Sequence, residues 1–160
     1  MTVQSDSDPL SPGVAPAALL RAARDVHVVQ LGPNRASFPL AGPDTAGAYS
    51  LSDFTMAAPP APSPPPHVHE DADECVYVLE GTLEMGVGED RLTGGPGSLM
   101  RAPRGTPHSL VNAGPGPARF IVVLSPPGFE GFWREMADLR ARIGGPPDPE
   151  IAVGCSTRTT

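Results

Sequence analysis

Two histidines separated by one residue are the best candidates for metal binding in this sequence. His67 and His69 lie at positions i and i+2, so both imidazoles would project from the same face of an extended strand. Imidazole is a common ligand of transition metals such as Zn, Cu, Fe and Ni. The pair can therefore supply two neighbouring ligands to one metal ion.

Four carboxylates follow the histidine pair, and Glu74 is the best third ligand among them. It opens an apolar strand and shares the parity of two valines further along, which places its side chain on a definite face. The other three, Glu70, Asp71 and Asp73, have the same chemistry but lie in the acidic loop that leads to the strand. We expect those three to be solvated, or to support the ligands by hydrogen bonds.

A third histidine, His108, could complete a set of four ligands. Glycine and proline residues precede it from Gly97 onward and can turn the chain, so that its strand runs antiparallel to a neighbour and the imidazole points inward. A single histidine is more often a surface or core residue. Three of the four histidines nevertheless fall into this arrangement, and only His27, which we interpret as structural, does not.

Short apolar segments punctuated by Gly and Pro predict the strands that position these residues. Their spacing of about 8 to 12 residues is typical of an all-β sandwich or barrel. Residues 120–124 are apolar throughout, which predicts burial on both faces. The proline-rich run 58–66 is interpreted as a stiff approach to the histidines rather than a linker. The expected strands are 26–31, 35–38, 48–57, 75–79, 83–87, 91–93, 98–102, 107–112 and 120–124.

One helix is predicted after the strands, with Ser125 as N-cap and Pro126 at the first helical position. We expect its apolar stripe to cover one side of the barrel or a partner subunit. Gly144 ends the helix. The stripe repeats at spacings of three and four residues and comprises Phe129, Phe132, Trp133, Met136, Leu139 and Ile143.

The expected organisation is a single domain with loose ends. It comprises a mobile lead-in at 1–24, in which 17–24 could form two helical turns, a barrel at 25–125, the helix at 126–144 and a flexible tail at 145–160. With a net charge of −7 and no basic run, nucleic acid is not an expected partner. No apolar run approaches the ~18 residues of a membrane span, and the first residues do not resemble a secretory signal. We expect a soluble cytoplasmic protein whose Cys75 and Cys155 are reduced.

The two histidine-containing stretches resemble the paired motifs of the cupins, small β-barrel proteins of jelly-roll type. The first motif is matched by His67-x-His69, four further residues, Glu74, six further residues and Gly81. A glycine expected ahead of this motif is replaced here by the proline run. The second motif is matched, with every spacing kept, at Gly97, Pro103, Gly105, His108 and Asn112.

This resemblance implies an all-β, cupin-type double-stranded β-helix, or jelly-roll barrel, with a C-terminal amphipathic helix. It also implies that His67, His69, Glu74 and His108 bind one divalent transition metal per chain, which could be Fe, Mn, Ni, Co, Cu or Zn. Within the superfamily, the proline entry and the terminal helix resemble single-domain, quercetin-dioxygenase-like cupins of bacteria.

Three histidines and one carboxylate leave open positions on the metal for substrate or dioxygen. The leading hypothesis is a dioxygenase acting on a small enolic or aromatic substrate, flavonol-like or polyketide-like. Glu74 would be its catalytic residue, taking a proton from the substrate and returning it. The alternatives are a metal-dependent isomerase or cyclase that uses no dioxygen, a cupin that binds a small ligand without catalysis, and a purely structural metal.

The remaining expectations concern the pocket and a second subunit. Expected partners are a small-molecule substrate, dioxygen for the dioxygenase, and no membrane. The strand at 75–79 places Tyr77 and Leu79 opposite its inward valines, and both faces need cover, so we expect a homodimer. The candidates for the pocket lining are inward apolar residues, namely Tyr49, Phe54, Met56, Met85, Met100, Leu110 and Phe120.

Overall fold

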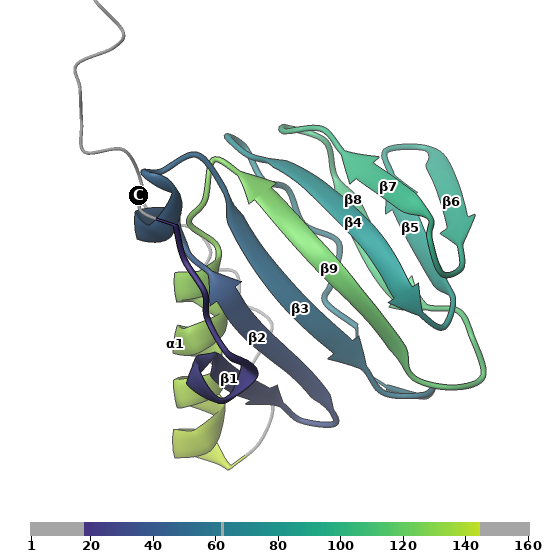
Figure 1. Ribbon diagram of the computed structural model, residues 1–160. Coiled ribbons are helices and arrows are strands. Elements are labelled where there is room, and N and C mark those ends of the chain that lie inside the picture. The colour runs from purple at the N-terminus through teal and green to yellow at the C-terminus, as the bar shows by residue number, and fades with distance from the viewer. Residues whose placement is uncertain (1–17, 62, 145–160) are drawn as a thin grey trace, which may run out of the picture.

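The chain folds into two antiparallel β-sheets and one α-helix in a computed structural model, which describes residues 18–61 and 63–144 (Figure 1). The larger sheet has six strands in the order β1-β2-β3-β9-β4-β7, and the smaller has three in the order β6-β5-β8. The elements are β1 (His27–Leu31), β2 (Asn34–Leu40), β3 (Ser50–Met56), β4 (Asp73–Glu80), β5 (Leu83–Val87), β6 (Asp90–Gly94), β7 (Leu99–Ala102), β8 (His108–Asn112), β9 (Ala118–Ser125) and α1 (Glu130–Ile143). This is the expected all-β, jelly-roll type of sandwich, although its two sheets do not close into a continuous barrel.

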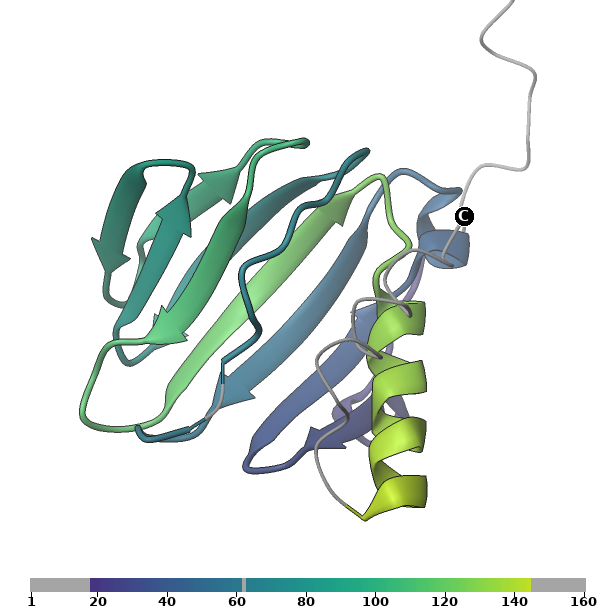
Figure 2. The ribbon, with the colours of Figure 1, turned by 180° about the vertical axis from the view of Figure 1, so that it is seen from behind.

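The small sheet and α1 lie on the same side of the large sheet (Figures 1 and 2). Figure 2 shows α1 in front of β1 and β2, and the small sheet in front of the opposite end. The segment that leads from β3 to β4 runs between these two covers. The inner face of the large sheet is therefore covered by α1 at one end and by the small sheet at the other. The candidate site lies between these two covers.

Strand β9 forms the centre of the large sheet and shows how the alternation of side chains builds the core. Phe120, Val122 and Leu124 point inward and are buried, whereas Ile121 and Val123 on the other face are half-buried. Burial on both faces, predicted for this apolar strand, is therefore wrong for the single chain. The reason is that no described element covers the outer face of the large sheet.

Gly81 holds the turn between β4 and β5 in a conformation that suits glycine. Its φ of +78° is left-handed, and a Cβ built there would lie 2.6 Å from the carbonyl oxygen of Pro117. The turn thus packs directly against the chain entering β9, which accounts physically for a glycine at this position.

The helix begins later than predicted. Strand β9 continues to Ser125, whose hydroxyl donates a hydrogen bond to the Ala48 carbonyl oxygen instead of capping a helix. Gly128 then has a φ of +147°, which no α-helix allows, so α1 starts only at Glu130. Near the N-terminus, one 3₁₀ turn at Ala23–Asp25 replaces the two expected helical turns.

Other boundaries are close to expectation, but the division into lead-in, barrel, helix and tail remains a prediction. The segments 1–17 and 145–160 lie outside the described residues. Within the described part, no helix is long and apolar enough to span a membrane.

The outer face of the large sheet exposes apolar side chains on neighbouring strands. Tyr77 on β4 pairs with Leu99 on β7 and Ile121 on β9, and Tyr77 and Leu99 are 44% and 65% exposed. The charged residues beside them are already paired within the chain, Asp53 with Arg119 and Asp73 with two arginines. With these neighbouring charges paired within the chain, the apolar side chains suit contact with a second copy of the same surface. The homodimer remains a prediction.

We expect light scattering to give twice the chain mass for the wild type. Leu99→Glu should shift the protein to the monomer, because it places a charge in the apolar contact. Leu92→Glu on β6 is the matched control, since Leu92 is also exposed but lies in the small sheet. A monomeric wild type would contradict the prediction.

Candidate metal centre

The four side chains predicted to be ligands come together at one point. One donor atom from each of His67, His69, Glu74 and His108 lies within 4.8 Å of those of the other three. His108 is at the start of β8, Glu74 is the second residue of β4, and the other two histidines lie in the segment before β4. The site thus takes residues from both sheets and from the segment between β3 and β4.

Backbone hydrogen bonds fix the histidine segment against β8. The amide of His67 donates to the carbonyl of His108, and the amide of His108 donates to the carbonyl of His67, each at 2.9 Å. The amide of Gly105 donates to the carbonyl of His69 at 2.8 Å. The expected regular strand is thus reduced to an isolated bridge at His67. The prolines at 64–66 explain this, because they have no amide hydrogen with which to extend the ladder.

Two of the imidazoles are oriented by carbonyl groups close in sequence. Nδ1 of His67 lies 2.9 Å from the Pro65 carbonyl oxygen, and Nδ1 of His108 lies 2.9 Å from that of Thr106. A carbonyl only accepts hydrogen bonds, so each Nδ1 carries the hydrogen and each Nε2 has a free lone pair when the ring is neutral. Nε2 of His108 is buried and has no hydrogen-bond partner among the described residues. Leaving such an atom unpaired costs about 1–3 kcal/mol, which metal coordination would remove.

Glu74 is the acidic member of the cluster and is only 6% exposed. Its Oε2 lies 3.2 Å from Nε2 of His69 and 3.7 Å from Nε2 of His108, the second being too long for a good hydrogen bond. Burial alone would raise the pKa of Glu74, but the two imidazoles outweigh burial and lower this pKa to about 2. The carboxylate is therefore ionised at neutral pH.

The same contacts shift two of the histidines in opposite directions. Burial lowers the pKa of His67. Burial also acts to lower the pKa of His108, but the Glu74 carboxylate outweighs it, so this pKa is raised. Three imidazole nitrogens around one carboxylate oxygen fit a divalent transition metal, which could take the place of a proton shared in the cluster.

Of the three carboxylates considered as alternatives to Glu74, Asp73 has a different role and the other two are exposed to solvent. Asp73 accepts a hydrogen bond of 2.9 Å from the backbone amide of Arg104, and this bond is the main cause that lowers the pKa of Asp73 to about 2. Asp73 thereby holds the loop that leads to β8. Glu70 and Asp71 are exposed, and His27 is exposed on β1 away from the cluster.

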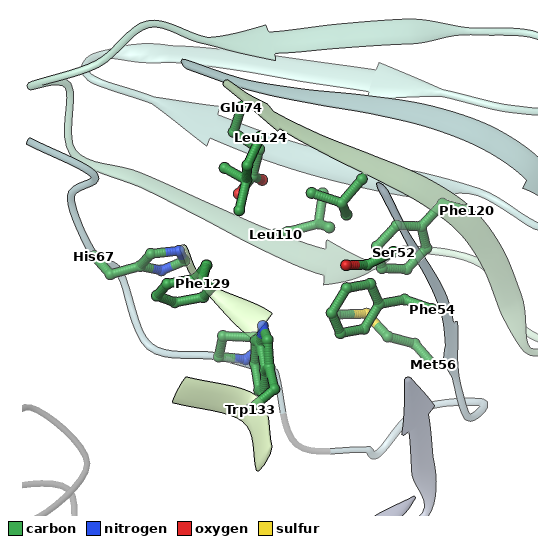
Figure 3. Close-up of a pocket in the computed structure, with 12 residues that line it drawn as sticks. Ser52, Phe54, Met56, His67, Glu74, Leu110, Phe120, Leu124, Phe129 and Trp133 are labelled. Atoms are coloured by element: carbon green, nitrogen blue, oxygen red, sulfur yellow. The ribbon is translucent and has the colours of Figure 1, made fainter. Parts of the chain in front are cut away.

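A cavity of about 50 Å³ adjoins the cluster, and Figure 3 shows His67 and Glu74 among its lining residues. Four of the seven predicted lining residues are found there: Phe54, Met56, Leu110 and Phe120. The other three do not line this cavity. Met85 and Met100 are buried in the core, and Tyr49 is 42% exposed because it precedes β3, where its backbone bonds to the Thr45 hydroxyl.

The aromatic and polar parts of the cavity wall are not predicted from the sequence. Phe129 lies with its ring centroid 4.4 Å from that of His69, and Trp133 packs edge-on against Phe54 at 5.4 Å. The apolar stripe predicts both only as packing residues, and their spacing of four residues is the available signal. The remaining unpredicted lining residues are Ser52, Pro64, Val122 and Leu124.

Comparisons with known proteins agree with this architecture. Residues 54–124 match the family model of the cupin domain. Germin-like protein 1-1 of Oryza sativa subsp. japonica is 37% identical over 97 residues, which cover 58% of this chain. The matched part is 43% of that relative, so the chain spans less than half of its length.

Solved structures show the same fold. The polyketide cyclase RemF from Streptomyces resistomycificus is 29% identical, with a TM-score of 0.56, over 68% of this chain and 80% of that one. A predicted oxalate decarboxylase from Thermotoga maritima has a TM-score of 0.61 at 16% identity, over 68% of this chain and 99% of that one. At this identity the second likeness shows the fold alone. With its matching domain, its jelly-roll sandwich and its three histidines and one glutamate, the chain belongs to the cupin superfamily.

Proposed function

We propose that this protein is a metal-dependent enzyme that removes a proton from an enolic or phenolic, polyketide-like aromatic substrate and thereby promotes its cyclisation or isomerisation. The observation that carries the proposal is the position of the His/Glu cluster at the end of an aromatic cavity. A metal there would meet the substrate directly, whereas a purely structural site would be closed.

His67, His69, Glu74 and His108 would hold the metal. When bound, a divalent ion supplies Lewis acidity that lowers the pKa of a substrate hydroxyl or enol. Glu74 stays ionised in its buried position, so its second oxygen is available to accept that proton and return it. A carboxylate with so low a pKa is a weak base. The main role of the metal ion would therefore be to lower the pKa of the substrate.

The lining of the cavity favours a neutral aromatic substrate over a small polyanion. Apart from His67 and Glu74, its described lining residues are uncharged, and four of them are aromatic: Phe54, Phe120, Phe129 and Trp133. A dicarboxylate would bring a second negative charge into this wall without a cation to pair with it, which is costly. Aromatic rings instead pack favourably against a planar conjugated ligand.

The likeness to a polyketide cyclase supports the oxygen-independent reaction as the first candidate. The dioxygenase predicted from the sequence is the second candidate. A small apolar cavity next to the donor atoms favours it, because such a space suits a molecule as small and apolar as dioxygen. A binding protein without catalysis would share the site but show no turnover.

We expect His67→Ala and His108→Ala to abolish stoichiometric metal binding after reconstitution, measured by mass spectrometry of the metal in purified protein. Each variant removes one of four ligands. His27→Ala is the matched control, because His27 is exposed and outside the cluster. Unchanged metal content in the two ligand variants would show that the assignment is wrong.

Glu74→Gln tests the carboxylate separately from the histidines. Loss of a residue that merely supports a ligand weakens metal binding by about 10- to 100-fold, and we expect at least that loss here because a direct, anionic ligand is neutralised. At metal concentrations high enough to fill the site, turnover should still be lost. Glu70→Gln, which changes an exposed carboxylate, should behave as the wild type. Full activity of metal-filled Glu74→Gln would remove Glu74 as the base.

Oxygen-electrode measurements on protein reconstituted with Fe, Mn, Co, Ni, Cu or Zn distinguish the candidate reactions. The substrates would be flavonols and enolic polyketide-like aromatics, with product formation followed by chromatography. We expect product without oxygen uptake. Uptake in proportion to product would instead establish the dioxygenase, and the absence of product with every metal would contradict both reactions and leave a binding protein or a structural metal.

A further inference from the structure

The cavity has a second polar point far from the metal ligands, at Ser52 on β3. Ser52 is 7% exposed, and its hydroxyl makes no hydrogen bond to any residue that the structure describes. Figure 3 shows Ser52 at the end of the cavity far from His67, with its hydroxyl directed toward the middle of the cavity. It is the only hydroxyl-bearing side chain among the described lining residues. A polar group aimed into an otherwise apolar wall fixes the orientation of a ligand.

The sheet register gives the distance between the two polar ends. Ser52 pairs with Val122 on β9, and Glu74 pairs with Leu124 on the other side of the same strand. Ser52 and Glu74 are therefore separated by two strand spacings across the sheet and by two residues along the strand direction. With about 4.8 Å between strands and about 3.4 Å per residue, their Cα atoms are roughly 12 Å apart. This span suits a bicyclic or tricyclic ligand rather than a single ring.

Aromatic side chains connect the two ends. Phe129 lies beside His69, Trp133 lies 5.7 Å from Phe129, and Phe54 lies 5.4 Å from Trp133. Phe54 in turn stacks on Phe120 at 5.6 Å. The wall between metal and hydroxyl is thus made of ring surfaces, which favour a flat, conjugated ligand.

Phe129, just before α1, and Trp133 on α1 partly fill the space that such a ligand needs. The cavity of about 50 Å³ is well below the roughly 300–1,000 Å³ of ordinary ligand pockets. Phe129 and Trp133 must therefore shift when the ligand enters. Trp133 is the only tryptophan in the chain, so its fluorescence reports on this event.

From these observations we propose that Ser52 is a specificity-determining residue, which hydrogen-bonds a neutral hydroxyl or carbonyl at the far end of a planar polyphenolic ligand whose other end binds the metal. The neutral group follows from the wall, because its described lining residues include no cation near Ser52 to pair with a carboxylate. This deepens the proposed function and rests on it for the metal-bound end. It does not depend on which reaction follows.

The test is a binding experiment on the zinc-loaded full chain, with quenching of Trp133 fluorescence as readout and calorimetry as a second measurement. The two probes are 3-hydroxyflavone and 3,4′-dihydroxyflavone, which differ only in a hydroxyl far from the metal-binding oxygens. We expect both to quench and the dihydroxy compound to bind about three- to tenfold more tightly, as one neutral hydrogen bond predicts.

Ser52→Ala should abolish this preference and leave the binding of 3-hydroxyflavone and the zinc content unchanged. Ser50→Ala is the matched control, because Ser50 is buried on the same face of β3 but does not line the cavity. It should retain the preference.

The proposal is overturned if the wild type binds the two flavones equally, if neither quenches Trp133, or if Ser52→Ala keeps the preference. The comparison of the two probes tests it on the wild type alone, so a poorly folding variant does not decide the matter. Zinc supports binding without redox chemistry, so failure of oxygen uptake or of cyclisation leaves this result unaffected.

Discussion

The burial of one carboxylate among three imidazoles is the interaction on which the rest of this structure depends. An ionised group at 6% exposure is stable only with positive charge beside it. Without a metal, that charge is a proton shared with the histidines, which is why the pKa of His108 is raised while that of Glu74 falls to about 2. A divalent ion meets the same requirement more completely, because it also satisfies the unpaired Nε2 of His108.

The fold is arranged to bring these groups together from distant parts of the chain. Glu74 comes from the large sheet and His108 from the small sheet, and the segment of His67 and His69 lies between the two covers of the inner face. Reciprocal backbone bonds between His67 and His108 fix the distance between two ligands without relying on side chains. Asp73 adds a further restraint from outside, since it holds the backbone of Arg104 in the loop that leads to β8.

Patterns in the local sequence predict those features of the fold that depend on neighbouring residues only. The alternation along β4 correctly placed Glu74 with the buried valines, and Gly and Pro residues marked most of the strand ends. Predictions failed where a distant part of the chain decides the outcome. Whether Ile121 is buried depends on what covers the outer face, and Gly128 delays the helix by a backbone angle that the apolar stripe does not reveal. Ser52 was missed for the same reason, because a lone serine in a strand becomes informative only when the opposite wall is known.

The position of α1 has an energetic consequence for ligand selection. Phe129 already packs on the imidazoles and Trp133 already packs on Phe54, so a flat ligand must first displace these contacts. The ring surfaces of the ligand then restore contacts of similar strength, about 0.5–1.5 kcal/mol for each aromatic pair. The aromatic middle of the cavity therefore selects for planar shape but adds little net affinity. Affinity and orientation must come from interactions that have no equivalent in the free protein, and the cavity offers these at its two polar ends, the metal site and the Ser52 hydroxyl.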